Sequence, residues 1–113
     1  SVSRRKGPFW YWRLRGLQAA IVKGKVPSFR TLCSMSHRKF YDGDPDVNYG
    51  QSRYLMYYLQ ETGLLRSFYK SARAAKKKDA TGYATLVATL GKPDMAEFQK
   101  RWTEYVLSLR FDG

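Results

Sequence analysis

The sequence predicts an all-α fold, a compact bundle of five or six short helices in a single domain spanning residues 1–113. Two observations lead to this class. Apolar residues recur at steps of three and four along most of the chain, which places them on one face of a helix. No segment shows the alternation of apolar and polar residues that is typical of a strand. With 43% hydrophobic and 16% aromatic residues, the chain has enough apolar side chains for one core.

Two helices are predicted in the first third of the chain. The first covers residues 9–23 and ends at Gly24, which can adopt a left-handed conformation. Its apolar face consists of Trp10, Leu14, Leu17 and Ile21. Ser28 is the expected N-cap of a short second helix that ends near residue 35.

A loop and a tyrosine-rich helix follow. The segment "YDGDPDVN", residues 41–48, is predicted to be a loop because Asp, Gly and Pro favour turns. The helix covers residues 47–62, with Asp46 or Asn48 as its N-cap and Gly63 at its end. Tyrosines occupy much of its circumference, so we expect it to be largely enclosed. The residues expected in the core are Tyr54, Met56, Tyr57 and Leu59.

Three helices are predicted in the second half. Residues 64–78 form an amphipathic helix whose outer face is basic. The next begins at Asp79 or Thr81 and ends at Gly91. The last runs over residues 94–109 and begins with a capping box, Asp94 with Glu97.

Charge is the most pronounced feature of the composition. There are 21 Lys and Arg against 9 Asp and Glu, a net charge of +12. This excess favours anionic partners. A candidate anion-binding face consists of Arg66, Lys70, Arg73 and Lys77. No run is apolar enough to span a membrane, and the single Cys33 leaves the redox compartment open.

Residue types needed for common catalytic and metal sites are scarce. A zinc peptidase needs two histidines one helical turn apart, and His37 is the only histidine. Cys33 could share a helical face with His37, but two ligands do not make a zinc site. Asp42, Asp44 and Asp46 alternate as in a calcium loop, yet the twelfth position counted from Asp42 is an arginine. We expect a solvated turn there, no catalytic residue and no cofactor.

The order of the segments resembles a known family. The segments "RLRGLQAAIVKGKVPSFRTL", "FYDGD", "NYGQSRYLMYYLQETGLLRSFYKSAR", "DATGYATLVATLG" and "DMAEFQKRWTEYVLSLRF" resemble the C-terminal helical portion of bacterial peptidase-MA-like domains, which belong to the gluzincin metallopeptidase clan. The resemblance covers residues 13–111. Its most specific parts are Tyr-Gly-Gln-Ser-x-Tyr-Leu and the closing Phe-Gln-x-x-Trp-x-x-Tyr-Val.

The resemblance implies a noncatalytic C-terminal subdomain of a zinc-metallopeptidase-like protein. In such domains the His-Glu-x-x-His helix and the third zinc ligand lie upstream of the matching helices, so zinc and catalysis would belong to a preceding segment. The family's Tyr-x-Gln matches Tyr49 and Gln51, which with Arg53 are the candidate cleft-facing residues. The expected partner is the rest of the same polypeptide or another protein, docked on the aromatic residues at 9–12.

The alternative function is a basic helical module that binds nucleic acid or another polyanion. Basic and aromatic residues are interleaved in "RRKGPFWYWRLR" and "RSFYKSARAAKKK", and base stacking on aromatic rings beside Lys or Arg is a common binding mode. No helix-turn-helix, zinc-finger or ribonucleoprotein motif accompanies them.

Overall fold

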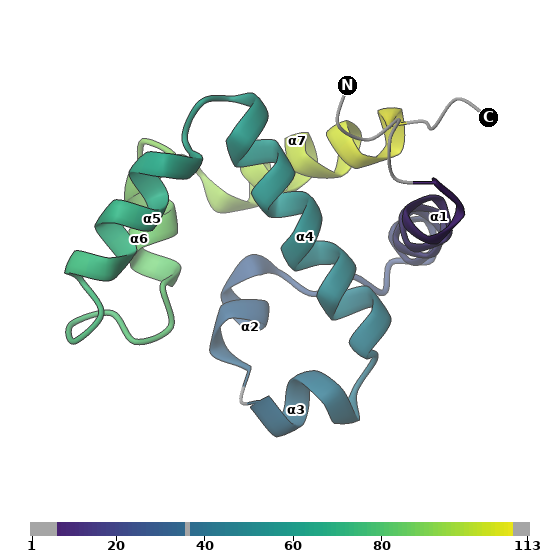
Figure 1. Cartoon of the computed structure of the whole chain (residues 1–113), viewed down its shortest axis with the longest axis horizontal. Coiled ribbons are helices and arrows are strands. Elements are labelled where there is room, and N and C mark those ends of the chain that lie inside the picture. Colours follow the sequence, from purple (N-terminus) through teal and green to yellow (C-terminus); the bar gives the residue numbers. More distant parts are fainter. Residues whose placement is uncertain (1–6, 36, 110–113) are drawn as a thin grey trace.

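The protein is built around one central helix. The computed structural model describes residues 7–35 and 37–109, and side chains within the ranges 14–35 and 38–109. Over these residues it contains seven helices, with no strand. Helix α4 (Pro45–Glu61) crosses the middle of the molecule and contacts α1 (Gly7–Val22), α3 (His37–Asp42), α5 (Leu65–Ala74) and α7 (Met95–Ser108) (Figure 1). The predicted all-α class is therefore confirmed.

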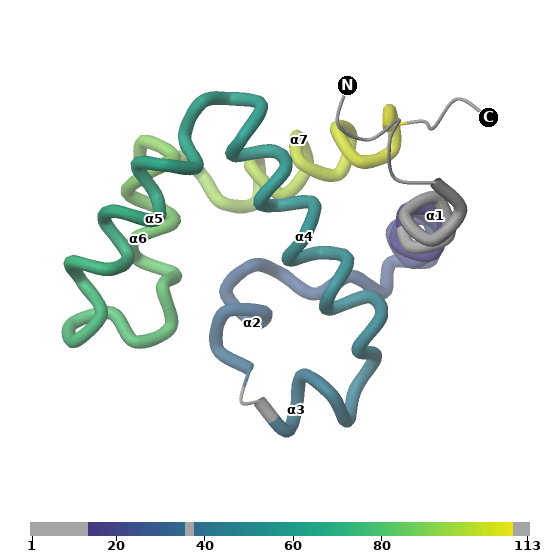
Figure 2. Tube along the Cα trace, viewed as in Figure 1, coloured from purple at the N-terminus to yellow at the C-terminus, as the bar shows by residue number. Residues whose placement is uncertain are grey.

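The remaining helices are arranged around α4 at the two ends of the molecule. Helices α5 and α6 (Tyr83–Thr89) pack together at one end of the long axis, and α1 lies at the other (Figure 2). Helix α2 (Phe29–Ser34) contacts α6 and follows the connection that leaves α1. No helix in the described part of the chain is long and apolar enough to cross a membrane.

Three glycines end helices as the sequence predicts. Gly24, Gly63 and Gly91 all have positive φ angles, of 69°, 78° and 85°. At the end of α4, the Gly63 amide donates to the Gln60 carbonyl at 3.1 Å and the Leu64 amide donates to the Leu59 carbonyl at 2.7 Å. This pair of bonds is the Schellman pattern, which satisfies the last carbonyls of the helix.

The helix starts are also defined by side-chain caps. The Ser28 hydroxyl accepts from the Thr31 amide at 3.1 Å, as predicted. Asp94 caps α7 by accepting from the Ala96 and Glu97 amides. For α4 the predicted cap was wrong: Asp44, rather than Asp46 or Asn48, accepts from the Val47 amide at 3.3 Å. Pro45 then occupies the first turn, where the absence of an amide hydrogen costs nothing.

Helix α3 was not predicted, so residues 41–48 are not one loop. Six residues are too few for an apolar periodicity to be recognisable, and contacts with α4 hold the helix instead. The Asn48 side-chain amide of α4 donates to the Phe40 carbonyl at 3.0 Å. Within α3, the exposed side chains of Arg38 and Asp42 form an ion pair at 3.4 Å. The expected count of five or six helices is thus too low by at least one.

The core is one cluster of aliphatic and aromatic side chains. The Phe29 ring packs against both Phe98 and Trp102, with ring centroids 5.4 and 5.0 Å away. Tyr54 and Leu59 are buried as predicted, whereas Met56 and Tyr57 are half-buried against the cluster. The other buried hydrophobic residues are Leu14, Leu17, Ala20, Leu32, Val47, Leu55, Leu86 and Val106. The core therefore joins α1, α2, α4, α6 and α7.

Candidate functional site

The three candidate cleft-facing residues do not share one face of α4. At 100° per residue, Tyr49 and Arg53 lie nearly above one another while Gln51 points the opposite way. Tyr49 is 39% exposed, Arg53 is half-buried and Gln51 is 0% exposed. Gln51 is therefore a core residue of this chain and not part of an exposed site.

Gln51 has a structural task in the core. Its side-chain amide donates to the Pro27 carbonyl at 2.8 Å, and the Gln99 amide donates to the same oxygen at 3.1 Å. Two helices, α4 and α7, are thereby tied to the connection between α1 and α2. The Gln51 Oε1 atom is buried and accepts no hydrogen bond within the described residues.

A cluster of tyrosines extends from Arg53 toward α7. The Arg53 guanidinium lies 5.5 Å from the centre of the Tyr57 ring, which packs edge-on against Tyr54 at 5.2 Å. Burial, followed by the neighbouring Tyr57, raises the pKa of Tyr54 to about 12. Burial, followed by the charge of Glu61, also raises the pKa of Tyr105. The raised pKa values keep the phenols of Tyr54 and Tyr105 protonated at neutral pH, which makes them poor bases and poor nucleophiles there.

The predicted basic face forms a groove on α5. Arg66, Lys70 and Arg73 line a hollow of about 430 Å³ together with Leu65 and Tyr69. All three cations are exposed. Lys77 is also exposed but lies beyond the last residue of α5 and does not line the hollow. Three of the four predicted anion-binding residues are thus brought together, and Tyr69 joins them.

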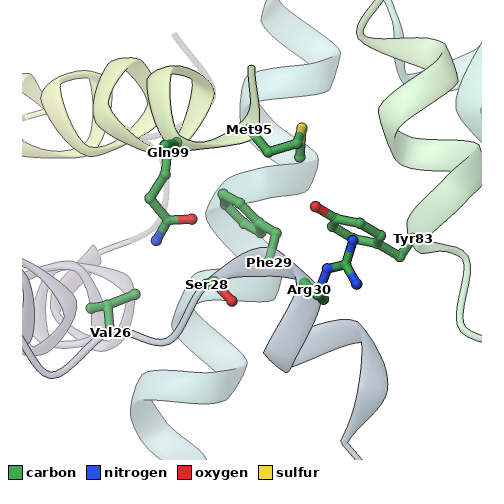
Figure 3. Close-up of a pocket in the computed structure, with 8 residues that line it drawn as sticks. Val26, Ser28, Phe29, Arg30, Tyr83, Met95 and Gln99 are labelled. Atoms are coloured by element: carbon green, nitrogen blue, oxygen red, sulfur yellow. The ribbon is translucent and has the colours of Figure 1, made fainter. Parts of the chain in front are cut away.

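A second hollow lies where α2, α6 and α7 meet. Its volume is about 510 Å³, and Phe29 forms its floor. Figure 3 shows Met95 and Gln99 entering from α7, Tyr83 from α6, and Arg30 from α2. The Arg30 guanidinium lies 5.2 Å from the centre of the Tyr83 ring. Sequence reasoning missed this hollow because no local pattern signals that residues 30, 83 and 99 will be neighbours.

Reactive and metal-binding side chains do not gather in the described part of the chain. It holds no group of three or more His, Cys, Asp and Glu residues placed to bind a metal ion. Burial, followed by the nearby charge of Asp79, raises the pKa of the half-buried Cys33 thiol, so the thiol is a poor nucleophile. Of the aspartates at 42, 44 and 46, Asp44 caps α4 and Asp42 pairs with Arg38.

Two predictions concern side chains that lie outside the described ones. They are the docking patch at residues 9–12 and the helical face that His37 could share with Cys33.

Comparison with known proteins identifies no relative of this chain. No protein-family profile, no curated protein and no solved structure matches the chain.

Proposed function

We propose that this chain is a noncatalytic helical subdomain that packs beside the catalytic region of a zinc-metallopeptidase-like protein. The proposal starts from the order of segments that resemble the C-terminal helices of peptidase-MA-like domains. These segments fall on α1 and α2, on α3, on α4 and α5, on α6, and on α7, in that order.

The observation that carries the proposal is the structural role of residues 49–55, the segment in which the resemblance to the family is most specific. It lies within the central helix, and its inward side chains hold other helices together. Gln51 is bound to the Pro27 carbonyl, and Tyr54 is 1% exposed within the core. These residue types, in these surroundings, support a scaffold more readily than a reaction.

Tyr49 is the exposed residue of this segment. It is 39% exposed on the first half of α4. Tyr41, on the adjoining helix α3, is 59% exposed. Tyrosine combines a large apolar ring with a hydrogen-bonding hydroxyl and is enriched at protein interfaces for this reason. We assign the contact with the catalytic region to this edge of α3 and α4.

The test begins with the reading frame before the codon for Ser1. We expect it to encode a His-Glu-x-x-His motif followed by a further glutamate, which together supply a zinc site. A frame without that motif would contradict the proposal.

The second part of the test uses the purified protein. The chain alone should take up zinc only substoichiometrically and should not hydrolyse peptides. The upstream polypeptide, supplied separately, should bind it, and the double change Tyr41→Ser and Tyr49→Ser should weaken that binding. The matched control is Tyr69→Ser, because Tyr69 is a similarly exposed tyrosine on α5. Tight binding of one zinc ion by the chain alone, or equal effects of the two changes, would count against the assignment.

A further inference from the structure

Helix α5 presents most of its surface to solvent. It contributes no buried residue, although Leu65 and Phe68 pack against the core from its inner side. The outer side carries Arg66, Lys70 and Arg73, which follow one another at one-turn intervals. Side chains three and four residues apart on a helix are neighbours, with about 5–6 Å between their Cβ atoms. The three cations therefore form one continuous row.

No salt bridge among the described side chains neutralises the positive charge of this row. The sequence of α5, LRSFYKSARA, contains no acidic residue. Within the part of the chain that the structure describes, none of the three cations makes a salt bridge. Since the whole chain carries a net charge of +12, an anion in this groove is attracted both by the three cations and by the positive charge of the rest of the chain.

An aromatic ring stands beside the row of cations. Tyr69 is 54% exposed and lines the same hollow as the three cations. Its hydroxyl donates to the Met56 sulfur at 3.7 Å, and its ring lies 6.1 Å from that of Phe68. These contacts orient the ring, so that stacking a planar group on it requires little further ordering of the side chain.

We propose that the α5 groove binds single-stranded nucleic acid, with one base stacked on Tyr69 and the adjoining phosphates neutralised by Arg66, Lys70 and Arg73. Proteins that bind single strands without sequence preference combine a basic groove with an aromatic stacking platform in this way. The inference is independent of the proposed peptidase relationship.

Other anionic partners fit the groove less well. An acidic peptide would satisfy the cations, but its acidic residues carry no aromatic ring to stack on Tyr69. An anionic membrane binds helices that offer a broad apolar face, whereas Phe68 of α5 packs against the core and Leu65 is the one aliphatic residue that lines the groove. A duplex keeps its bases stacked on one another, so it would leave Tyr69 without a base.

The length of the row sets the size of the site. Residues 66 to 73 span about 10 Å along the helix axis at about 1.5 Å per residue. With about 3.4 Å per nucleotide in a stacked strand, the row faces about three phosphates. Neutralising about three phosphates of a single strand gives a slope of log K against log salt of about −2, hence about a 16-fold loss of affinity between about 50 and about 200 mM salt.

The test measures fluorescence anisotropy of a labelled oligothymidylate with the full chain. The groove variant combines Arg66→Gln, Lys70→Gln and Arg73→Gln, since glutamine is a good helix former. The control variant removes an equal number of positive charges outside the groove, through Lys25→Gln, Lys100→Gln and Arg101→Gln, all at exposed positions. The groove variant should lower the affinity, and it should reduce the magnitude of the slope of log K against log salt by about 2. The control variant should change both quantities little. Equal losses in the two variants would mean that net charge alone attracts the strand and would overturn the proposal.

Two variants of Tyr69 test the stacking platform. Tyr69→Ala should weaken binding by about fivefold or more, and Tyr69→Phe should keep most of the affinity because the ring and its contact with Phe68 remain. Affinity that is unchanged by Tyr69→Ala, equal affinity for a duplex of the same length, or binding to anionic vesicles without binding to the oligonucleotide would each refute the assignment. Circular dichroism of every variant checks that the helices are retained.

Discussion

The double hydrogen bond at the Pro27 carbonyl predicts a specific energetic coupling between Gln51 and Gln99. Both side-chain amides donate to this one oxygen, at 2.8 and 3.1 Å. Either residue can be replaced without leaving the carbonyl unpaired, because the other donor remains. Replacing both removes every side-chain donor that the structure shows at this oxygen.

The magnitudes follow from the surroundings of the two side chains. The change Gln51→Leu loses one hydrogen bond, worth a net ~1 kcal/mol, but also removes the buried Oε1 atom that has no partner among the described residues, which restores ~1–3 kcal/mol. We therefore expect Gln51→Leu to be neutral or slightly stabilising. Gln99→Leu should cost ~1 kcal/mol, because Gln99 is only half-buried and loses one bond. The double variant should lose ~1 kcal/mol more unfolding free energy than the two single variants lose together, because the Pro27 carbonyl is then without a side-chain donor. This value is at the low end of the cost of an unpaired buried carbonyl because Pro27 is half-buried.

Urea unfolding of the four proteins, followed by circular dichroism, gives the three free-energy differences needed for a double-mutant cycle. Free energies that add within ~0.3–0.5 kcal/mol would refute the reasoning, since the carbonyl would then not depend on these two donors. A large loss of stability from Gln51→Leu alone would also contradict it. In that case the Oε1 atom would be engaged in a favourable contact.

Three further outcomes follow from the structure. The change Gly50→Ala should stabilise the protein by ~0.5–1 kcal/mol in thermal unfolding, because the added Cβ would contact Leu17 at an ordinary 3.5 Å, whereas Gly63→Ala should destabilise it because φ is +78° there. Raising the pH from about 10 should progressively lower stability in urea titrations, since the raised pKa of Tyr54, about 12, means that the folded state holds its proton beyond the point where the unfolded chain releases it. Tyr54→Phe should flatten that loss. Asp79→Ala should lower the melting temperature at neutral pH, because the Thr85 amide donates to the Asp79 carboxylate at 2.8 Å and this bond is lost. The same bond holds the pKa of the Asp79 carboxyl below its usual range, so the effect of the change should fade as the pH falls through that lowered pKa. A melting temperature unchanged by Asp79→Ala at neutral pH would contradict the third outcome.

Asp79 also shows that a capping residue can be predicted correctly while the predicted start of its helix is wrong. The fifth predicted helix is expected to start at Asp79 or Thr81, but the corresponding helix, α6, begins at Tyr83 after Gly82. Both predicted residues nevertheless satisfy first-turn amides: Asp79 accepts from Thr85 and Thr81 accepts from Tyr83. The intervening turn lets side chains further upstream reach the helix start.

The sequence by itself determined the all-α class, the glycine ends of three helices, the caps at Ser28 and Asp94, and the exposure of the α5 cations. These features depend on residues within one or two turns of each other, so their physical causes are present in any short stretch of the chain: backbone freedom at glycine, side-chain acceptors for free amides, and apolar spacing.

Only the tertiary structure decided which way Gln51 faces, that α3 forms, and that Arg30, Tyr83 and Gln99 meet in one hollow. The Pro27 carbonyl binds side chains 24 and 72 positions away, and α3 is held by Asn48 from the following helix. Polar side chains such as Gln51 fit either a surface or a core with a suitable partner, and the partner here exists only once distant helices have packed.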